Sequence, residues 1–520
     1  MKYTYLKRVV LALCVALAGV SSLSAEDKTV TLLFTNDVES AYDPIPAHWR
    51  GDMEMIGGIA EMTTLIRTLR ASEPNVFLFD SGDIFTGSLA KETEGALAFE
   101  LMTTMGYDAM AIGNHEFEYG VEIFEWAKNR APFPVLGANM FYRGTEHPYA
   151  QAHAIIERGG VRIGVIGIMG RDAVSAIIPS NIAALDVRDE AAAVQRSVDA
   201  IRADVDLVVL LTHQGKTAPM QTDAESDPRL QRDIDADIAL AGAVRGVDVL
   251  FAGHADAGTL KPVVHLDTGT LIMQTYGQAT HLGFLQLVVD DASGKIKSYD
   301  GKLMPVDAGA IAPDPRILAK LSDYRGRFPA LFEQVGVAAH FMARKYIEES
   351  DVGNLFADII REAAGTELAF VHAGSLRKDI PEGPLTRADL LDVYPFVDDV
   401  MTFTLSGKQL REILEQSLSQ ERGLMQISGF STRYDYARPV GQRLVSMKRE
   451  GKDILPGDMF TAAAPGFLAE GGDLFTSFAE SQPQASVGSV ADIITAYFSN
   501  AASVAAPEKG RQQDVTRSGP

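Results

Sequence analysis

The feature that most constrains the fold is a series of short apolar runs that alternate with amphipathic stretches between about residue 29 and residue 290. The runs cover Val30–Thr35, Val76–Asp80, Ala109–Ile112, Arg162–Ile168, Asp206–Thr212 and Val247–Ala252. Runs of this length, rich in Val, Ile, Leu and Phe, are typical of strands buried within an α/β domain. Helices are predicted between them, for example over Ile59–Arg70 and Phe117–Lys128.

The chain as a whole divides into domains at proline-rich and polar segments. A first domain is predicted over residues 26–305, and a helical connector over residues 306–335, where prolines bracket a helical spacing of apolar residues. A second α/β block follows over residues 336–505. Residues 506–520 are mostly polar and include five charged side chains, which predicts a disordered tail.

The N-terminus resembles a targeting segment. Cationic residues precede an uncharged apolar run from Val9 to Val20, and small residues follow up to Ala25. This run is much shorter than the roughly 20 residues that span a bilayer, which disfavours the alternative of a membrane anchor. We therefore expect a signal peptide over residues 1–25, a periplasmic or secreted protein, and no membrane anchor in the mature chain. The single cysteine, Cys14, lies within the signal peptide, so the mature chain forms no disulfide.

The net charge of −22 excludes one class of partner. A protein that binds nucleic acid through phosphate contacts carries a basic surface, so no nucleic-acid partner is expected. A small phosphorylated substrate would need a local cationic site, and bound metal ions are the simplest one.

Polar side chains follow five of the six predicted strands of the first domain. They are Asp37 and Glu39, Asp83, Asn114 and His115, His213, and finally His254 and Asp256. Any one of these residues could be a helix cap, a turn residue or a hydrogen-bonded core histidine. Ligands in α/β sheets bind outside the carboxyl ends of the strands, however, so five such ends together indicate one site. These residue types could hold two divalent cations that share a carboxylate.

The motifs that carry these residues resemble a known family. Ser81-Gly82-Asp83, Gly113-Asn114-His115-Glu116, Thr212-His213 and Gly253-His254 resemble the calcineurin-like metallophosphoesterases, in particular the periplasmic 5′-nucleotidase family. The second block resembles that family's C-terminal domain at Gly374-Ser375-Leu376-Arg377, Tyr394-Pro395-Phe396 and Phe467–Asp473. The resemblance implies an α/β protein of two domains. An N-terminal four-layer αββα calcineurin-like metallophosphoesterase sandwich would be joined by the helical connector to a C-terminal α/β nucleotide-binding domain.

The same resemblance implies roles for the strand-end residues. Asp83 would bridge two divalent metal ions. Asn114, His213 and His254 would complete the ligands of one ion, and Asp37 would bind the other. His115 resembles the catalytic histidine of the family, and Glu118 stands where an aspartate usually orients that histidine.

The second domain would bind the substrate. By resemblance, Phe396 and Phe467 would sandwich the base, Asp473 would accept the ribose hydroxyls, and Arg377 would clamp phosphate, with Arg361 as a second clamp. Ordinary core packing is the alternative for the phenylalanines. Gly471-Gly472 favours an exposed loop beside Phe467, because core segments rarely need two consecutive glycines.

Three positions depart from the family pattern. Glu39 stands where a histidine is usual, Asp256 where His or Gln is usual, and His372 where an Asn is common. The first two changes add carboxylates to the same metal site. Carboxylates suit Mn²⁺ or Mg²⁺, whereas imidazoles suit Zn²⁺ or Co²⁺, so we expect a mixed pair drawn from Mn, Mg, Zn and Co.

The predicted function is that of a secreted dinuclear-metal phosphohydrolase that releases phosphate from nucleotides by metal-hydroxide attack, as 5′-nucleotidases do. Alternatives on the same scaffold are a 2′,3′-cyclic nucleotide phosphodiesterase/3′-nucleotidase, a UDP-sugar hydrolase and, less favoured, a thiosulfonate-ester hydrolase. A non-catalytic nucleotide-binding relative is the alternative from another class. Nucleotides or nucleotide esters are the expected partners, and the sequence predicts no oligomeric state.

Overall fold

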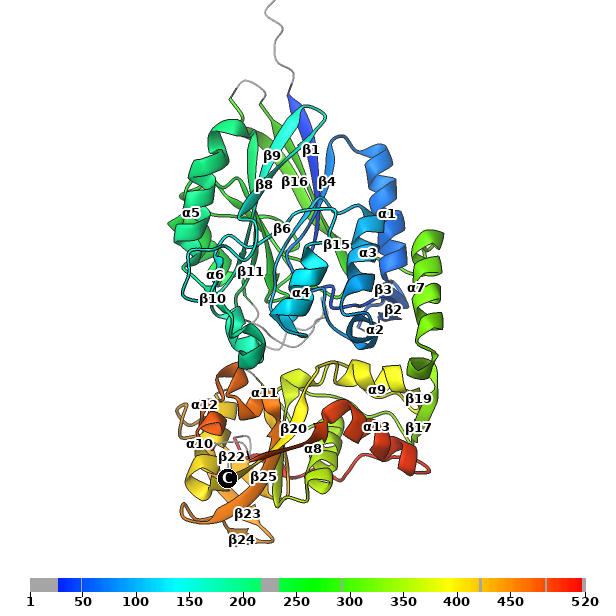
Figure 1. The fold of residues 1–520 in the computed structure, drawn as a ribbon, viewed down its shortest axis with the longest axis vertical. Helices are drawn as coiled ribbons and strands as arrows, with labels where there is room; N and C mark the ends of the chain where they lie inside the picture. Colours follow the sequence, from blue (N-terminus) through cyan, green and yellow to red (C-terminus); the bar gives the residue numbers. More distant parts are fainter. Residues whose placement is uncertain are drawn as a thin grey trace, which may run out of the picture.

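The computed structural model describes residues 27–47, 49–216, 233–290, 293–419, 423–481 and 484–516. The predicted signal peptide lies outside these residues. The described chain forms two domains stacked along the long axis of the molecule, with the first domain above the second in Figure 1. Within the described ranges, no helix is both long enough and apolar enough to span a bilayer.

The first domain is built on two six-stranded sheets, with strand orders β16-β15-β1-β4-β5-β6 and β13-β14-β12-β11-β9-β8. The strands of the first sheet are β1 (Lys28–Thr35), β4 (Val76–Asp80), β5 (Ala109–Ala111), β6 (Val135–Leu136), β15 (His281–Val289) and β16 (Ile296–Pro305). Those of the second are β8 (His153–Arg158), β9 (Val161–Met169), β11 (Leu207–Gln214), β12 (Val249–His254), β13 (Val263–Val264) and β14 (Leu271–Met273). Strands β1, β4, β5 and β6 run parallel, as do β9, β11, β12 and β14.

The two sheets pack face to face because alternate side chains of each strand are apolar. Val30 and Phe34 of β1 lie in the core between the sheets, whereas Leu33 lies in the core beneath the helices. Across the sheet interface, Phe34 stacks on Phe251 with 4.1 Å between ring centroids.

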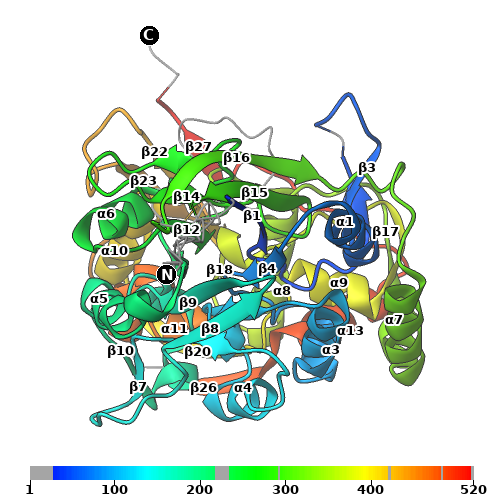
Figure 2. The same cartoon turned by 90° about the horizontal axis from the view of Figure 1, so that it is seen from above.

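Helices cover the outer face of each sheet, as the view from above shows (Figure 2). One sheet is covered by α1 (Ile59–Ser72), α3 (Ala96–Met105) and α4 (Val121–Lys128), and the other by α5 (Glu190–Ile201) and α6 (Asp235–Ala243). This arrangement confirms the predicted four-layer αββα sandwich.

One predicted helix has a different start. The sequence predicts a helix over Phe117–Lys128, but α4 begins at Val121, and His115–Phe117 forms a separate 3₁₀ turn. Gly120, with a φ of 87°, separates the two segments. The break leaves His115 on a short turn that follows the carboxyl end of β5, rather than on the side of a long helix.

The connector and the second domain follow the predicted order. Helix α7 (Pro315–Arg327) begins after Asp314, whose side chain accepts a hydrogen bond from the Arg316 N–H, and it packs on α1 and α3. The second domain contains a five-stranded sheet of order β21-β18-β25-β20-β26, with apolar cores on both faces, and a four-stranded sheet of order β24-β23-β22-β27.

The elements of the second domain complete the fold. Its strands are β17 (Gln334–Ala338), β18 (Leu368–His372), β19 (Gly383–Thr386), β20 (Asp399–Ser406), β21 (Met425–Ser428), β22 (Ser431–Tyr434), β23 (Leu444–Arg449), β24 (Lys452–Asp453), β25 (Met459–Pro465), β26 (Ala485–Ser489) and β27 (Gln512–Asp514). Its helices include α8 (Asp351–Ala364), α9 (Arg387–Val393), α10 (Gly407–Ser417), α11 (Gly466–Ala469), α12 (Thr476–Ala479) and α13 (Val490–Asn500).

The predicted disordered tail over residues 506–520 is wrong for its described part, which ends at residue 516. Strand β27 pairs in parallel with β22, and Arg511 forms a two-point ion pair with Asp358 of α8. Glu349 accepts hydrogen bonds from the backbone N–H groups of Gly510, Arg511 and Gln512. The polar and charged residues that suggested disorder instead form specific contacts with the second domain, such as the ion pair between Arg511 and Asp358.

Candidate active site

The carboxyl ends of the parallel strands in both sheets meet at one rim of the first domain, and this rim faces the second domain (Figure 1). A cleft opens between the two domains at this point. From the first domain it is lined by Asp37, Glu39, Asp83, Asn114, His115, Glu118, His254 and Asp256. From the second domain it is lined by Arg344, Tyr346, His372, Arg377, Phe396, Phe467 and Asp473. Most of the residues predicted from the sequence therefore meet in one place.

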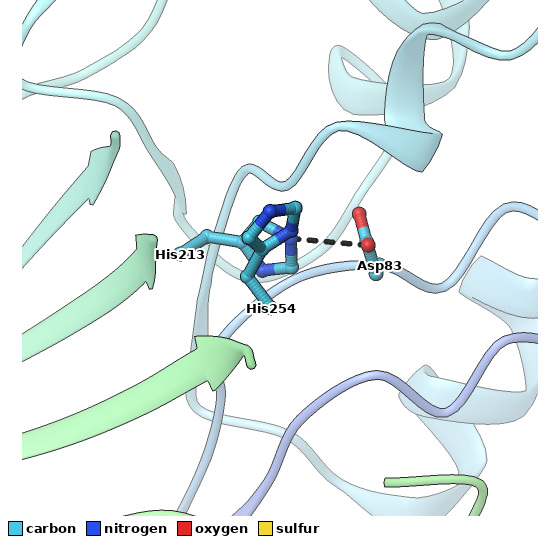
Figure 3. Close-up of side chains that lie close together, drawn as sticks. All are labelled: Asp83, His213 and His254. Atoms are coloured by element: carbon cyan, nitrogen blue, oxygen red, sulfur yellow. Dashed lines mark ion pairs between the residues drawn. The ribbon is translucent and has the colours of Figure 1, made fainter. Parts of the chain in front are cut away.

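One group of side chains in the cleft is arranged like a set of metal ligands. Ligand atoms of Asp83, His213 and His254 all lie within 4.8 Å of one another (Figure 3). The Nε2 atom of His213 lies 3.0 Å from an Asp83 carboxylate oxygen and 3.0 Å from the amide oxygen of Asn114. On the other side of the ring, Nδ1 donates to the Ser81 carbonyl at 2.8 Å. This hydrogen bond directs Nε2 toward the ligand cluster, as is usual for metal-binding histidines.

A second group shares Asp83 with the first. Ligand atoms of Glu39, Asp83 and His115 also lie within 4.8 Å of one another. Asp37 is fixed close by, because its carboxylate accepts hydrogen bonds from the backbone N–H of His254 at 2.8 Å and from Asn36 at 2.9 Å. The membership of Asp83 in both groups is what a bridging carboxylate requires.

The charges of this cluster call for a cation. Burial raises the pKa of Asp37 to about 7, against the opposing effect of His213. Burial alone would lower the pKa of His213, but Asp83 and Asp37 outweigh it and raise that pKa to about 10. In the protein without metal, protons therefore supply the positive charge that the buried carboxylates need. A divalent ion would supply the same charge and displace those protons.

Backbone strain is concentrated at the same residues. A positive φ, which L-residues rarely adopt, is found at Asp37 (48°), Glu39 (44°), Asp83 (63°), His254 (71°) and Asp256 (52°). Each such residue costs of order 1–3 kcal/mol and persists where the surroundings hold it in place. These loops are thus shaped to aim side chains at the rim at the expense of stability.

Glu116 holds two of these loops together, a role that the sequence analysis missed. Its buried carboxylate accepts hydrogen bonds from the backbone N–H groups of Asp83 at 2.9 Å, Ile84 at 2.8 Å and Gly113 at 2.6 Å. It therefore ties the loop after β4 to the loop after β5, and fixes the strained backbone of Asp83. Glu116 belongs to the Gly113-Asn114-His115-Glu116 motif that the sequence analysis singled out. Its role could not be read from that motif, because a side chain that binds backbone N–H groups requires no particular residue types as partners.

His115 and Glu118 form a pair at the mouth of the metal-ligand cluster. The Nδ1 atom of His115 lies 3.1 Å from a Glu118 carboxylate oxygen, which fixes the ring. Its Nε2 atom lies 3.3 Å from Glu39 and 3.1 Å from Arg377 of the second domain. Burial opposes protonation, but Asp83, Glu118 and Glu39 outweigh it and raise the pKa of His115 to about 9. The ring is therefore positioned to hold a proton that faces the cleft.

The aromatic residues of the second domain lie next to this pair. The ring of Phe396 lies 5.8 Å from that of His115, and the Arg377 guanidinium lies 5.4 Å from the Phe396 centroid. The backbone N–H of Phe467 is held by Asp398, which Tyr394 also contacts. A side chain at Gly472 would come within 2.3 Å of the Phe467 ring and would displace it from its present position. Phe467 is half-buried, which agrees with a ring that presents one face to the cleft.

Arg361 does not reach the cleft, so the prediction that it clamps phosphate is wrong. It lies on α8, and its Nε donates to the Ser428 hydroxyl at 2.8 Å. A second guanidinium in the cleft comes instead from Arg344, whose backbone N–H is held by Asp379 at 2.7 Å. No spacing singles out Arg344 in the sequence, because it lies in an irregular segment that only the fold brings to the site.

Comparison with known proteins assigns both halves of the chain. The calcineurin-like phosphoesterase family matches residues 30–255, and the 5′-nucleotidase C-terminal domain matches residues 334–480. The chain belongs to the 5′-nucleotidase family. This membership, together with the ligand cluster in the cleft, makes it a metal-dependent phosphoester hydrolase.

Relatives in this family align along most of the chain. The 5′-nucleotidase of Homo sapiens is 27% identical over 522 residues, which cover 89% of this chain and 87% of that protein. Endonuclease YhcR of Bacillus subtilis is 27% identical over 423 residues, 78% of this chain but 34% of that longer protein. The crystal structure of a 5′-nucleotidase precursor from Thermus thermophilus superposes with a TM-score of 0.82 at 26% identity, covering 94% of this chain and 99% of that one.

The residues in the cleft fit the divalent metals that the 5′-nucleotidase family implies. The two ligand groups offer carboxylate oxygens and imidazole nitrogens, and the amide oxygen of Asn114 lies beside them. Carboxylate and imidazole donors of this kind bind Mn²⁺, Mg²⁺, Zn²⁺ or Co²⁺.

Proposed function

We propose that the protein is a periplasmic or secreted 5′-nucleotidase that uses two divalent metal ions to release phosphate from nucleotides. The observation that carries this proposal is the contact between the domains. Arg377 and the aromatic residues of the second domain share one cleft with His115 and the ligand cluster of the first domain. A phosphate at the cluster would thus have its nucleoside between the domains.

The proposed metal ligands divide into two sets that share Asp83. Asn114, His213 and His254 would complete one set, and Asp37, Glu39 and Asp256 the other. The first set contains two imidazoles, and the second adds three carboxylates to Asp83, which supports a mixed pair such as Zn²⁺ or Co²⁺ beside Mn²⁺ or Mg²⁺. When bound, such ions would neutralise the phosphoryl oxygens and lower the pKa of a water molecule, which would then lose a proton to solvent near neutral pH and become a nucleophile for phosphorus.

Side chains of both domains would handle the rest of the reaction. Arg377 would bind two phosphoryl oxygens at once, as the planar guanidinium permits, and Arg344 is close enough to the cleft to assist. The Nε2 atom of His115 would donate a proton to the departing ribose oxygen. Glu118, 3.1 Å from Nδ1, would keep the ring in the orientation that allows this transfer.

The second domain would bind the nucleoside. Phe396 and Phe467 would stack on the two faces of the base, and stacking of this kind is sequence-tolerant because every base has an aromatic face. Asp473, also in the cleft, would accept hydrogen bonds from the ribose hydroxyls. A cleft that combines aromatic and carboxylate groups with a phosphate site supports a nucleotide as substrate over a simple phosphate ester.

A substrate panel tests this proposal. The mature protein, freed of metal and then supplied with Mn²⁺, Mg²⁺, Zn²⁺ or Co²⁺, would be assayed for phosphate release. The panel would contain 5′-, 3′- and 2′,3′-cyclic nucleotides, a UDP-sugar and p-nitrophenyl phosphate. We expect the highest kcat/KM on a 5′-mononucleotide. A preference for the cyclic nucleotide or the UDP-sugar would show that the enzyme acts on a different leaving group from that of a 5′-mononucleotide. Binding of nucleotides without turnover would contradict catalysis.

A further inference from the structure

Asp398 is a buried carboxyl group in the wall of the cleft, and it takes no part in the reaction proposed above. It lies between α9 and β20, two residues after Phe396. Both of its carboxylate oxygens face the backbone N–H of Phe467, at 3.1 and 3.3 Å, and the Tyr394 hydroxyl donates to one of them at 3.2 Å. Asp398 therefore joins the segments that carry the two rings of the proposed base site.

The two rings are anchored in different cores, on opposite faces of the five-stranded sheet. Phe467 packs against the core that contains Phe370 of β18, whereas Phe396 packs against the core that contains the next residue of that strand, Val371. Successive side chains of a strand point to opposite faces of a sheet, so the two cores lie on its two sides. Packing within either core alone therefore does not fix the distance between the rings.

Backbone pairing also stops short of the rings. Strands β20 and β25 pair antiparallel, and their ladder ends at Val400 and Pro465. Phe467 lies two residues further along, on the four-residue helix α11, whose N-cap residue is Pro465. The first N–H groups of a helix need acceptors, and a proline side chain provides none. Asp398 accepts the N–H of Phe467 instead, and so extends the link between the two strands as far as the rings.

We propose that Asp398 is a positioning residue that fixes the separation between the Phe396 and Phe467 rings, so that the cleft favours nucleotides over phosphate esters without a base. This inference rests on the proposed function, in which the base lies between the two rings. Carbon atoms attract one another most strongly at about 3.5–4.0 Å, and a gap of roughly 0.5–1 Å forfeits a quarter to a half of that attraction. A site that opened by this amount would still bind phosphate and ribose, but it would lose much of its affinity for the base.

The chemistry of the carboxylate gives a matched set of variants. Asp398→Asn removes the charge but leaves an oxygen acceptor at the same position, whereas Asp398→Glu keeps the charge and moves the acceptor outward by one methylene group. Asp398→Leu fills a similar volume and offers no acceptor. The contact with Phe467 should therefore survive in Asp398→Asn and be lost in the other two variants. Asp399→Glu, at the exposed neighbouring position, serves as the control.

The test compares AMP with ribose 5-phosphate, which carries the same phosphate ester and no base. Assays at pH 8 keep the carboxyl ionised, because burial raises the pKa of Asp398 to about 7. We expect the wild type, Asp399→Glu and Asp398→Asn to favour AMP in kcat/KM by roughly thirtyfold or more, the effect of two stacks. In Asp398→Glu and Asp398→Leu this ratio should fall by roughly fivefold to thirtyfold through a higher KM for AMP, with kcat changed far less.

The same assays contain the results that would overturn the proposal. Equal losses on AMP and ribose 5-phosphate would do so, because a merely structural residue does not change a ratio of substrates. An unchanged ratio in Asp398→Glu and Asp398→Leu would also do so. A loss in Asp398→Asn as large as that in Asp398→Glu would show that the charge matters and the position of the acceptor does not, which again overturns the proposal.

A second site provides an independent variant if substitutions at Asp398 prevent folding. A methyl group at Gly466 would come within 2.7 Å of an Asp398 carboxylate oxygen, so in Gly466→Ala the carboxylate would have to move. The preference for AMP should fall in this variant too. A folded Gly466→Ala protein that kept the full preference would overturn the proposal.

Titration of the metal-free protein with adenosine tests the base site apart from turnover. Binding to the wild type that weakens by roughly fivefold or more in Asp398→Glu would support the inference even if no nucleotide were hydrolysed. Equal binding by the two proteins, or no binding by the wild type, would overturn it. Hydrolysis of AMP with the same substrate ratio in all variants would leave the proposed function in place and remove this inference alone.

Discussion

The guanidinium of Arg377, from the second domain, lies 3.1 Å from the Nε2 atom of His115, from the first. The same guanidinium lies 3.4 Å from Glu39, a predicted metal ligand. A side chain of one domain therefore meets the proposed proton donor and the ligand cluster of the other. This contact makes the cleft a single site, and the order of the domains in the chain gives no hint of it.

The first prediction concerns Arg377 itself. Arg377→Lys keeps the charge but removes the planar fork that binds two phosphoryl oxygens, so kcat/KM for AMP should fall by roughly tenfold to a hundredfold. Arg361→Lys is the matched control, because Arg361 lies on α8 and donates to Ser428 away from the cleft. Steady-state kinetics of both variants decide the point. Equal effects of the two substitutions would contradict the assignment of Arg377.

The second prediction concerns the base. Phe467→Ala should weaken AMP binding by about 1–3 kcal/mol, the value of one base–aromatic stack, and should affect p-nitrophenyl phosphate much less. Comparison of KM for the two substrates measures this difference. Phe467 also packs against the core of the second domain. Loss of folding in the variant, seen by circular dichroism, would favour the core-packing role instead.

The third prediction concerns Glu116. Glu116→Gln leaves one carbonyl oxygen for three backbone N–H donors and turns an NH₂ group toward them. We expect a loss of about 1–3 kcal/mol in the free energy of unfolding and weaker metal binding, because the loop that carries Asp83 is released. Urea unfolding of the metal-free protein and titration with Mn²⁺ provide the two readouts. Glu122→Gln, at an exposed position of α4, should change neither, and an unchanged metal affinity in Glu116→Gln would refute the role.

The fourth prediction concerns pH and Asp398. Burial raises the pKa of this carboxyl to about 7, against the hydrogen bonds from the Phe467 backbone and Tyr394. Between the ordinary pKa near 3.8 and pH 7, the folded state therefore binds a proton that the unfolded state has lost. Its contribution to stability falls as the pH rises through this window, by at most about 1.4 kcal/mol per pH unit, and is constant above it.

Asp398→Asn tests this directly, because the amide cannot ionise. Denaturant unfolding at pH 5 and pH 7.5 should show a smaller loss of stability with rising pH in the variant than in the wild type. The same slope in both proteins would show that Asp398 does not titrate in this range.

Much of the first domain could be predicted from its sequence, because buried strands and the polar residues after them leave local patterns. Asp37, Asp83 and Asn114 each follow a strand and His254 ends one, and parallel strands bring their ends together. Arg344 and Glu116 left no such pattern. Arg344 reaches the cleft from an irregular segment, and Glu116 acts on backbone groups, two of which belong to a loop distant in sequence. The ordered tail was also missed, because the ion pair between Arg511 and Asp358 depends on tertiary contact alone.

The most direct test of the account is phosphate release from AMP by the mature protein, measured with the metal content of the same sample. We predict two divalent ions per chain, hydrolysis that a chelator abolishes and Mn²⁺ or Mg²⁺ restores, and at least about a hundredfold loss in Asp83→Asn, because Asp83 would serve both ions. A metal-loaded protein that binds AMP without releasing phosphate, or an Asp83→Asn variant that keeps both ions and full activity, would contradict it.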